Sequence, residues 1–131
     1  MPVRVLVADD SDGVRELVTL LLDLESDFTV VGQARDGLEA VERARALQPD
    51  LVVLDVSMPR LDGLTATPRI RSASSGSRIA LFTGIAEAGI EAEAVSAGAD
   101  ALLTKELGAA TLIERLREIC RGPRGLMSST A

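Results

Sequence analysis

Five polar side chains stand where apolar runs of the sequence end, and they are the residues best suited to chemistry. They comprise three carboxylates, one hydroxyl and one ammonium group: Asp9, Asp10, Asp55, Thr83 and Lys105. Three carboxylates that lie close together stay ionised only when a cation is present. Because the chain has no His and a single Cys, the cation that fits best is Mg²⁺, which binds oxygen ligands and keeps several waters.

This set of residues could accept a phosphoryl group. A carboxylate such as Asp55 can attack phosphorus and form an acyl phosphate. A metal ion and Lys105 would then neutralise the oxygens of a loose, in-line transition state. The residue types alone therefore indicate a phosphoryl-acceptor site.

Each of these residues also has a purely structural explanation. Asp10, Ser11 or Asp12 could cap the first helix, and Asp55 could be a turn residue. Thr83 could be an ordinary strand residue, and Lys105 could be a solvated surface charge. If each explanation held, however, four separate strand ends would carry these polar residues by coincidence. Their occurrence together at the strand ends favours a functional site.

The elements that position these side chains follow from the apolar periodicity. Runs typical of β-strands alternate with segments typical of amphipathic helices. The predicted strands span 3–8, 28–34, 51–54, 78–83 and 101–104. Strict alternation predicts a parallel sheet that is covered by helices on both faces and joined by right-handed crossovers. Ligands bind such sheets at the carboxyl ends of the strands, which is where the five polar residues lie.

Three of the predicted helices carry a regular apolar stripe. Their inward positions are Val14, Leu17, Val18, Leu21 and Leu22; then Leu38, Val41, Ala44 and Leu47 in the segment 37–47; and finally Leu112, Ile113, Leu116, Ile119 and Cys120. Pro68 interrupts the segment 63–72, so we expect the third helix to be kinked or to start late. In the second case, Thr67 could cap a helix whose first residue is Pro68. The segment 87–97 has few large apolar anchors, so we expect the fourth helix to be loosely held.

Length and composition exclude several classes of protein. The 131 residues, 47% of them hydrophobic, suit one domain. Without His there is no Ser-His-Asp triad, no His-based zinc site and no phosphohistidine intermediate, and the single Cys120, expected to be buried, allows no intrachain disulfide. A net charge of −6 and 2% aromatic residues argue against direct nucleic-acid binding by this domain. The sequence has no membrane-spanning run and no signal peptide, which predicts cytoplasmic residence.

Four stretches of the sequence resemble the receiver domain of two-component response regulators. They are V-L-V-A-D-D at 5–10, L-V-V-L-D-V-S-M-P-R-L-D-G at 51–63, L-F-T-G at 81–84 and A-G-A-D-A-L-L-T-K at 97–105. The pieces R-D-G-L-E-A-V and T-K-E-L-G-A-A-T-L look most like the NarL/FixJ type with LuxR-type output, whose receivers usually precede a helix-turn-helix DNA-binding domain. The resemblance implies a flavodoxin-like, doubly wound α/β fold, with a five-stranded parallel sheet in the order 2-1-3-4-5 and five helices.

The resemblance also implies how the site is loaded. Asp55 would be the phosphoacceptor, modified by the phosphohistidine of a sensor histidine kinase. Asp10 and Asp55 would bind Mg²⁺ directly, together with the backbone carbonyl of Ser57. Asp9 would act largely through a metal-bound water.

The same resemblance implies how the signal leaves the site. Thr83 would hydrogen-bond the phosphoryl group, and Lys105 would pair with it. Movement of the loop that bears Thr83 would remodel the face formed by the fourth helix, fifth strand and fifth helix, and so change contacts in a homodimer or with an effector.

The resemblance also implies the domain boundaries. The receiver would span residues 1–121, and residues 122–131 would be a linker or tail, with any DNA contact made by a domain beyond it. Such a domain is not an enzyme, because it assists only its own phosphorylation and dephosphorylation.

The chain departs from the family pattern in four places. Leu102 stands where the family has a switch aromatic, and Glu106 stands where most receivers have a cis proline. Pro68 perturbs the third helix. Ser57 and Ile85 occupy positions that adjust the phosphoryl lifetime. We hypothesise that Ile85 shields the phosphoryl group from water, so that Ile85→Glu should lose phosphate faster than the parent.

Two other functions remain open from the residues alone. A degenerate receiver would hold a protein interface without phosphorylation, and Leu102 and Glu106 are compatible with this alternative. A phosphatase of the haloacid dehalogenase type would need a second Asp at position 57, where this chain has Ser57, and a nucleophile on the first strand. Nucleotide binding is disfavoured, because neither G-x-x-x-x-G-K-[ST] nor G-x-G-x-x-G occurs.

Overall fold

Six strands lie side by side in one parallel sheet, in the order β2-β1-β3-β4-β5-β6. The computed structural model describes residues 1–84, 89–122 and 127–128. The strands are β1 (Val3–Ala8), β2 (Phe28–Ala34), β3 (Leu51–Asp55), β4 (Arg78–Thr83), β5 (Ala101–Thr104) and β6 (Met127–Ser128). The first five confirm the predicted sheet and its order 2-1-3-4-5. Strand β3 is one residue longer than predicted, because it includes Asp55.

The sixth strand was not expected from the sequence. Met127 and Ser128 pair in parallel with Ala101 and Leu102 of β5. Two residues in a Gly- and Ser-rich stretch are too few to show apolar alternation, so the local sequence carries no sign of this pairing. The segment predicted as a linker or tail thus meets the sheet at these two positions.

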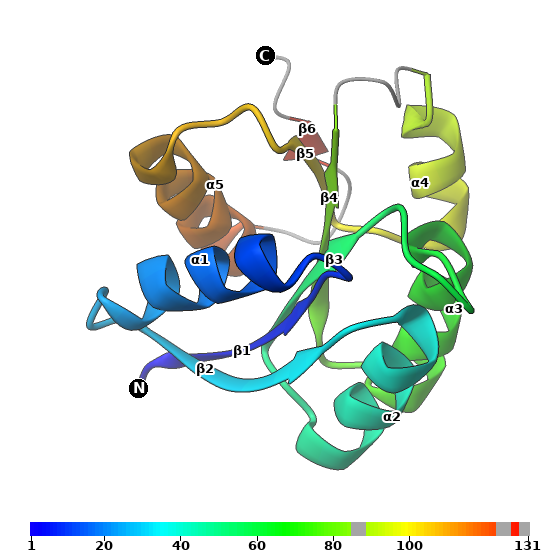
Figure 1. Cartoon of the computed structure of the whole chain (residues 1–131), viewed down its shortest axis with the longest axis horizontal. Coiled ribbons are helices and arrows are strands. Elements are labelled where there is room, and N and C mark those ends of the chain that lie inside the picture. The colour runs from blue at the N-terminus through cyan, green and yellow to red at the C-terminus, as the bar shows by residue number, and fades with distance from the viewer. Residues whose placement is uncertain (85–88, 123–126, 129–131) are drawn as a thin grey trace.

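In the described residues, five helices cover the two faces of the sheet (Figure 1). They are α1 (Asp12–Asp23), α2 (Gly37–Leu47), α3 (Gly63–Ala73), α4 (Glu91–Ala97) and α5 (Ala109–Arg121). Figure 1 shows α1 and α5 on one side of the sheet and α2, α3 and α4 on the other. In the part of the chain that the structure describes, no helix has the length and apolar character needed to cross a membrane.

The two helix layers explain why the strands read as near-continuous apolar runs. In β1, Leu6 and Ala8 belong to the core cluster that packs against α2, α3 and α4. Val5 and Val7 belong to the cluster beneath α1 and α5. Because both faces are buried, alternate residues of each central strand enter different cores, and neither set is polar.

The buried stripes of α1 and α2 are narrower than the sequence predicts. In α1, Val18 is buried, whereas Leu17 is 55% exposed; successive helical residues point about 100° apart. In α2, Ala40 and Ala44 are fully buried, whereas Leu38 is 44% exposed. Leu38 lies two residues before Ala40, about 200° around the helix, and therefore faces away from the core.

Helix α5 buries the predicted residues except for the cysteine. Leu112, Ile113, Leu116 and Ile119 are buried, as the periodicity predicts. Cys120 is only partly buried and packs against the edge of this cluster. Burial still raises the pKa of the Cys120 thiol to about 11, so the thiol is protonated at neutral pH.

Helix α3 starts where the predicted segment 63–72 starts, so the alternative of a late start is wrong. It begins at Gly63, and Asp62 is its N-cap, with the Asp62 side chain accepting a hydrogen bond of 2.8 Å from the Thr65 N–H. Thr67 is not the cap, because it lies inside the helix and its hydroxyl donates to the Gly63 carbonyl at 2.7 Å. Pro68 is therefore an interior helical residue. The Asp62 carboxylate therefore fixes the start of α3, and the helix contains Pro68 in its interior.

Helix α4 is short and shallowly packed. It begins at Glu91 rather than at residue 87, and the segment 85–88 lies outside the described residues. Ala94 is its buried residue, and Val95 is 57% exposed. The cap residue Ile90 offers no side-chain hydrogen bond to the first turn. This packing agrees with the expectation of a loosely held helix.

Candidate functional site

The carboxyl ends of four strands meet at one edge of the sheet. Ala8 of β1 pairs with Leu54 of β3, so the residues that follow them, Asp9 and Asp55, are neighbours across the two strands. Strand β4 ends beside Asp55, and Thr83 pairs with Thr104 at the end of β5, one residue before Lys105. Strand register therefore gathers the five predicted polar residues at this edge, as the sequence predicts.

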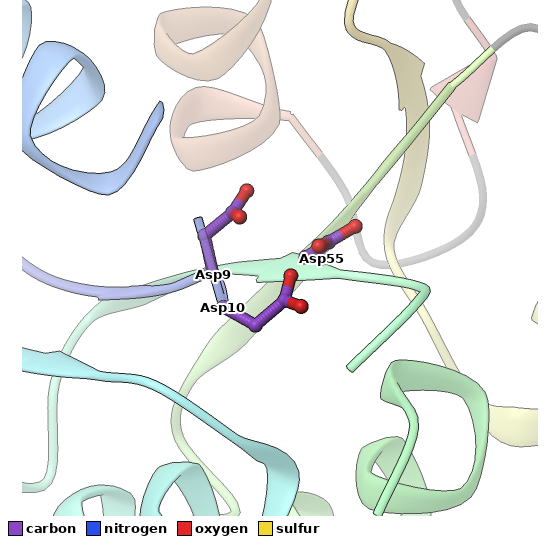
Figure 2. A group of neighbouring side chains, drawn as sticks. All are labelled: Asp9, Asp10 and Asp55. Atoms are coloured by element: carbon purple, nitrogen blue, oxygen red, sulfur yellow. The ribbon is translucent and has the colours of Figure 1, made fainter. Parts of the chain in front are cut away.

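Three carboxylates form a cluster at this edge (Figure 2). Asp9, Asp10 and Asp55 each offer an oxygen, and these oxygens lie within 4.8 Å of one another. Asp9 and Asp55 are 2% and 4% exposed, while Asp10 is open to solvent. In Figure 2 the carboxyl groups of Asp10 and Asp55 lie close together, each coming from a different strand end. Two of the three charges are thus held away from water.

Lys105 bridges the two buried carboxylates. Its Nζ lies 3.2 Å from Oδ2 of Asp9 and 3.1 Å from Oδ1 of Asp55. The same ammonium group lies 5.8 Å from the centre of the Phe82 ring. None of the peptide bonds in the described residues is cis, so the bond from Lys105 to Glu106 is trans. The lysine reaches the cluster without the cis bond that most of the family uses.

The protonation of Asp55 reflects this crowding. Burial and the negative charge of Asp9 raise the pKa of Asp55 to about 6, against the opposing effect of Lys105. Burial lowers the pKa of Lys105, but the charges of Asp55 and Asp9 outweigh it, and the pKa lies above its ordinary value. The lysine stays charged, and one ammonium group does not fully balance the cluster.

These residues fit a divalent cation. The cluster carries three carboxylates and one ammonium group, and a further positive charge would relieve the repulsion that raises the pKa of Asp55. Carboxylate oxygens, without nitrogen or sulfur ligands, are the donors that Mg²⁺ prefers. The acidic cluster is therefore chemically suited to Mg²⁺.

The loop between β3 and α3 lies directly against the cluster. The Ser57 N–H donates a hydrogen bond of 3.3 Å to Oδ1 of Asp55. Ser57, Met58 and Pro59 line an open pocket of about 710 Å³ that also contains Asp10. The loop thus combines a backbone donor to Asp55 with an open pocket beside the acidic cluster.

The remaining predicted site residues lie at the end of β4 and in β5. The Thr83 side chain is buried, and its hydroxyl donates to the Gly84 carbonyl at 3.2 Å. Leu102 is 7% exposed in β5, opposite Leu81, and belongs to the core on the α4 side. Ile85 lies outside the described residues, so its predicted shielding role stays a prediction.

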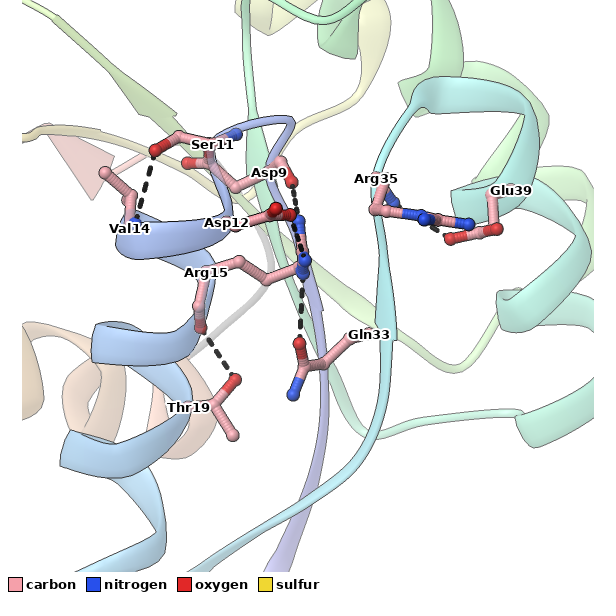
Figure 3. Close-up of polar contacts among 9 residues, drawn as sticks. All are labelled: Asp9, Ser11, Asp12, Val14, Arg15, Thr19, Gln33, Arg35 and Glu39. Carbon is pink, nitrogen blue, oxygen red and sulfur yellow. Dashed lines mark hydrogen bonds and ion pairs between the residues drawn. The ribbon is translucent and has the colours of Figure 1, made fainter.

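A buried arginine at the start of α1 was missed by the sequence reasoning (Figure 3). Arg15 is 7% exposed, and its Nη1 donates to the backbone carbonyl of Asp9 at 2.9 Å. Its Nε donates to Gln33 at 3.0 Å, and its Nη2 pairs with Asp12. Arg15 lies three residues before Val18 on the buried stripe of α1, and a charge at that spacing is the signal that could have revealed it.

The fold and the cluster together define a flavodoxin-like α/β domain with an acidic site at the carboxyl edge of its sheet. The chain belongs to the response regulator receiver domain family, whose sequence profile matches residues 5–117. The resemblance drawn from the sequence motifs is thereby confirmed. A receiver domain is the regulatory part of a two-component response regulator.

The curated relatives of this chain differ in how much of their length it covers. It is 45% identical over 109 residues to protein-glutamate methylesterase/protein-glutamine glutaminase 4 of Myxococcus xanthus, covering 82% of this chain and 31% of that protein. It is 32% identical to the transcriptional regulatory protein LnrK of Bacillus subtilis, covering 92% of this chain and 54% of LnrK. It is 34% identical to the chemotaxis protein CheY of Halobacterium salinarum, covering 91% of this chain and 98% of CheY. The chain thus spans about a third to a half of the first two relatives and nearly the whole of the third.

Solved structures show the same fold. The response regulator domain of Thermotoga maritima CheB has a TM-score of 0.84 and 35% identity, over 94% of this chain and 99% of that chain. A LuxR-family response regulator from Aurantimonas has a TM-score of 0.88 and 32% identity, over 98% and 91%. The receiver domain of a NarL regulator from Mycobacterium tuberculosis has a TM-score of 0.87 and 33% identity, over 93% and 98%.

Proposed function

We propose that the chain is the phosphorylation-controlled input of a two-component response regulator, with Asp55 as its phosphoacceptor. The observation that carries the proposal is the bridge of Lys105 between Asp55 and Asp9, inside a carboxylate cluster at the carboxyl edge of the sheet. The donor is a sensor histidine kinase, and the reaction takes place in the cytoplasm. An intact bridge is unnecessary in a degenerate receiver, so it favours a working site.

Asp55 acts as the nucleophile. Its carboxylate oxygen bonds to phosphorus while the P–N bond of the donor's protonated phosphohistidine breaks and neutral imidazole leaves. The pKa of Asp55, about 6, keeps most of this carboxylate ionised at neutral pH. The Ser57 N–H, 3.3 Å from Oδ1, holds the carboxylate in one orientation for the attack.

The rest of the cluster balances charge. Asp10 and Asp55, with the carbonyl of Ser57, would hold Mg²⁺ directly, and Asp9 would hold it largely through water. When bound, Mg²⁺ supplies positive charge next to the phosphoryl oxygens. Nζ of Lys105 lies 3.1 Å from Oδ1 of Asp55 in the unphosphorylated chain. After phosphoryl transfer, Lys105 forms its ion pair with a phosphoryl oxygen instead.

Thr83 turns phosphorylation into a change of shape. Its hydroxyl, which donates to the Gly84 carbonyl here, turns to donate to the phosphoryl group. This change passes along the chain to α4, which responds readily because it is shallowly packed. Leu102 is already buried, so the signal does not need an aromatic side chain to move inward. The changed surface of α4, β5 and α5 then controls a homodimer or an output domain.

The output that we propose is a helix-turn-helix transcription regulator, which would follow a receiver of residues 1–121 and a linker from 122. The similarity to LnrK, along 92% of this chain, supports it. The similarity to the methylesterase of M. xanthus supports a different output, a catalytic domain outside the receiver. The reading frame beyond Ala131 distinguishes the two, because a basic helix-turn-helix sequence supports the first and a methylesterase sequence contradicts it.

Phosphotransfer from acetyl phosphate tests the proposed site. With Mg²⁺, the intact mass of the parent should rise by one phosphoryl group, and that of Asp55→Asn should not. Asp62→Asn is the matched control, because Asp62 is exposed and asparagine can also cap α3. A parent that gains no mass with either acetyl phosphate or a histidine kinase would show a degenerate receiver.

A further inference from the structure

An ion pair ties the loop between β3 and α3 to the start of α2. Nε and Nη2 of Arg60 lie 2.9 Å and 2.8 Å from the same oxygen, Oδ2 of Asp36. The Asp36 side chain is 9% exposed and that of Arg60 is 64% exposed. The other oxygen of Asp36 caps α2 by accepting a hydrogen bond of 2.8 Å from the Glu39 N–H. Asp36 therefore links a rigid helix end to the loop that carries Ser57.

The backbone of Arg60 is in an unusual conformation. Its φ is 64°, and it is one of two described non-glycine residues with a positive φ, the other being Gln48. Glycine or asparagine adopts this left-handed region most readily. An arginine in this position is explained by its side chain, which reaches Asp36, rather than by its backbone preference.

A second contact joins the same two segments without any charge. Gly37, the first residue of α2, lies so close to the loop that a Cβ added to it would be 2.0 Å from the Leu61 carbonyl oxygen. The helix start and the loop backbone are therefore in direct contact. The ion pair of Asp36 and Arg60 lies beside this contact, so the loop is held at two adjacent points.

The other end of the loop closes on Asp55 itself. The Gly63 N–H donates to the Val56 carbonyl at 2.8 Å. A Cβ added to Gly63 would lie 2.2 Å from the carbonyl oxygen of Asp55. The segment from 56 to 62 is thus a short arch with one base at Asp55, and Ser57 lies on the arch. A shift at Arg60 must be taken up by these few residues.

We propose that Asp36 and Arg60 are positioning residues for the divalent-cation site, holding the arch so that the Ser57 carbonyl and the Asp55 carboxylate converge on one ion. This inference rests on the proposed function for the identity of the cation. Neither residue touches the acidic cluster, and their effect passes through the loop backbone. Breaking the pair should weaken Mg²⁺ binding while leaving the three carboxylates in place.

The sign of the effect separates positioning from simple electrostatics. Arg60 is a positive charge near a cation site, so removing it would strengthen Mg²⁺ binding if only its charge mattered. Loss of the pair would instead weaken binding, because the loop would lose its support. Residues that orient metal ligands typically change metal affinity by tenfold or more.

Calorimetric titration with MgCl₂, without any phosphodonor, tests the proposal. For Arg60→Gly, which suits a positive φ, the Kd for Mg²⁺ should rise about tenfold. Asp36→Asn, which keeps a cap for α2, should give a similar rise, and the double variant should be no weaker than either single variant because the two residues act as one unit. Arg35→Gln removes an exposed positive charge from the same end of α2 without touching the loop, and its Kd should stay the same or fall.

The outcomes separate this proposal from the proposed function. An unchanged or lower Kd in Arg60→Gly overturns the positioning role, as does a rise in Arg35→Gln of the same size. A drop in the unfolding midpoint of Arg60→Gly in EDTA large enough to unfold the chain would also overturn it, since the pair would then be a general structural contact. In the acetyl phosphate reaction, the Mg²⁺ concentration for half-maximal rate should rise while the rate at saturating Mg²⁺ is kept. If the parent binds Mg²⁺ but takes no phosphoryl group, the proposed function fails and the Kd comparison still decides the positioning role.

Discussion

At the scale of single residues, the sequence predicts the site because each functional side chain ends an apolar run. Asp55 follows four buried residues and is itself 4% exposed. The long-range contacts beside the site were not predictable in this way. Arg15 contacts Gln33, 18 positions away, and Arg60 contacts Asp36, 24 positions away. Such pairs depend on how distant loops meet, and no local spacing records them.

The raised pKa of Asp55 predicts a stability that depends on pH. Folding raises this pKa from 3.8 to about 6, so the folded state holds the proton more tightly than the unfolded state does. The resulting stabilisation is complete below about pH 4, falls as the pH rises towards 6, and is absent above it. In EDTA, Asp55→Asn should therefore unfold with a free energy about 1 kcal/mol above that of the parent at pH 8, and the two should be equal near pH 4.

Urea unfolding at the two pH values measures this difference. The expected difference in the free energy of unfolding is smaller than the full pKa shift would give, because solvent reaches the cluster at Asp10 and screens its charges. Added Mg²⁺ should stabilise the parent at pH 8 more than it stabilises Asp55→Asn. A gain in stability that is the same at pH 4 and pH 8 would show that the carboxylate charge is not its cause.

At the scale of elements, burial on both faces makes the strands predictable and leaves the helix ends uncertain. Five strands match the sequence prediction to within one residue, because each is a run of apolar residues between turns. Of the two alternatives predicted for α3, a kink or a late start, the late start is wrong, since the side chain of Asp62 caps the helix ahead of Pro68. Strand β6 was missed because its two residues show no strand pattern of their own. Their pairing depends on the backbone groups that β5 offers on the side away from β4.

The interior proline of α3 predicts a stabilising substitution. Pro68 is exposed and has no N–H to donate to the carbonyl of Leu64, one turn earlier. Pro68→Ala should raise the free energy of unfolding by roughly 1–2 kcal/mol, less than the full cost of a proline because the unfolded chain also gains freedom. Thermal unfolding followed by circular dichroism measures the change.

A glycine at the same position is the matched comparison. Pro68→Gly restores the N–H but favours the helix less than alanine does, by about 1 kcal/mol. Its stability should therefore lie below that of Pro68→Ala. If both variants are less stable than the parent, α3 is adapted to the proline and the restored hydrogen bond is not formed.

At the scale of the whole molecule, buried charges at the amino ends of the strands are paired differently from those at the carboxyl ends. At the edge opposite the site, Asp100 is 2% exposed and accepts hydrogen bonds from the Ile79 N–H at 2.8 Å and from Arg71 at 2.6 Å. Arg71 also donates to the Gly98 carbonyl at 2.9 Å. This charge is paired in a structural network, whereas the cluster at Asp55 carries more negative charge than Lys105 balances. The imbalance at one edge is what marks it as the functional one.

The position of α5 predicts where the chain can be shortened. Nη1 of Arg78 donates to the carbonyls of Ile119 and Gly122, at 2.7 Å and 2.5 Å, and so fixes the end of α5. A chain that ends at Gly122 should accept phosphate as the parent does and should lose less than about 1 kcal/mol of stability, because the described residues beyond 122 add only the two-residue pairing of β6 with β5. Denaturant unfolding and the acetyl phosphate reaction measure both quantities.

A shorter chain that ends at Glu118 is the control for this truncation. It removes Ile119, which is 1% exposed, and should lose roughly 2–4 kcal/mol as a buried apolar side chain is deleted. If the chain that ends at Gly122 is equally unstable, the residues after 122, including the pairing of β6, belong to the folded core rather than to a linker.

The central claim is that Asp55, and not a neighbouring carboxylate, receives the phosphoryl group. Borohydride reduction of the phosphorylated chain converts an acyl phosphate to an alcohol, and peptide mass mapping then identifies the modified residue. The structure predicts homoserine at position 55 in the parent, formed only when Mg²⁺ and a phosphodonor are both present. Homoserine at position 9 or 10, or none at position 55 in a chain whose intact mass shows phosphorylation, would contradict the assignment.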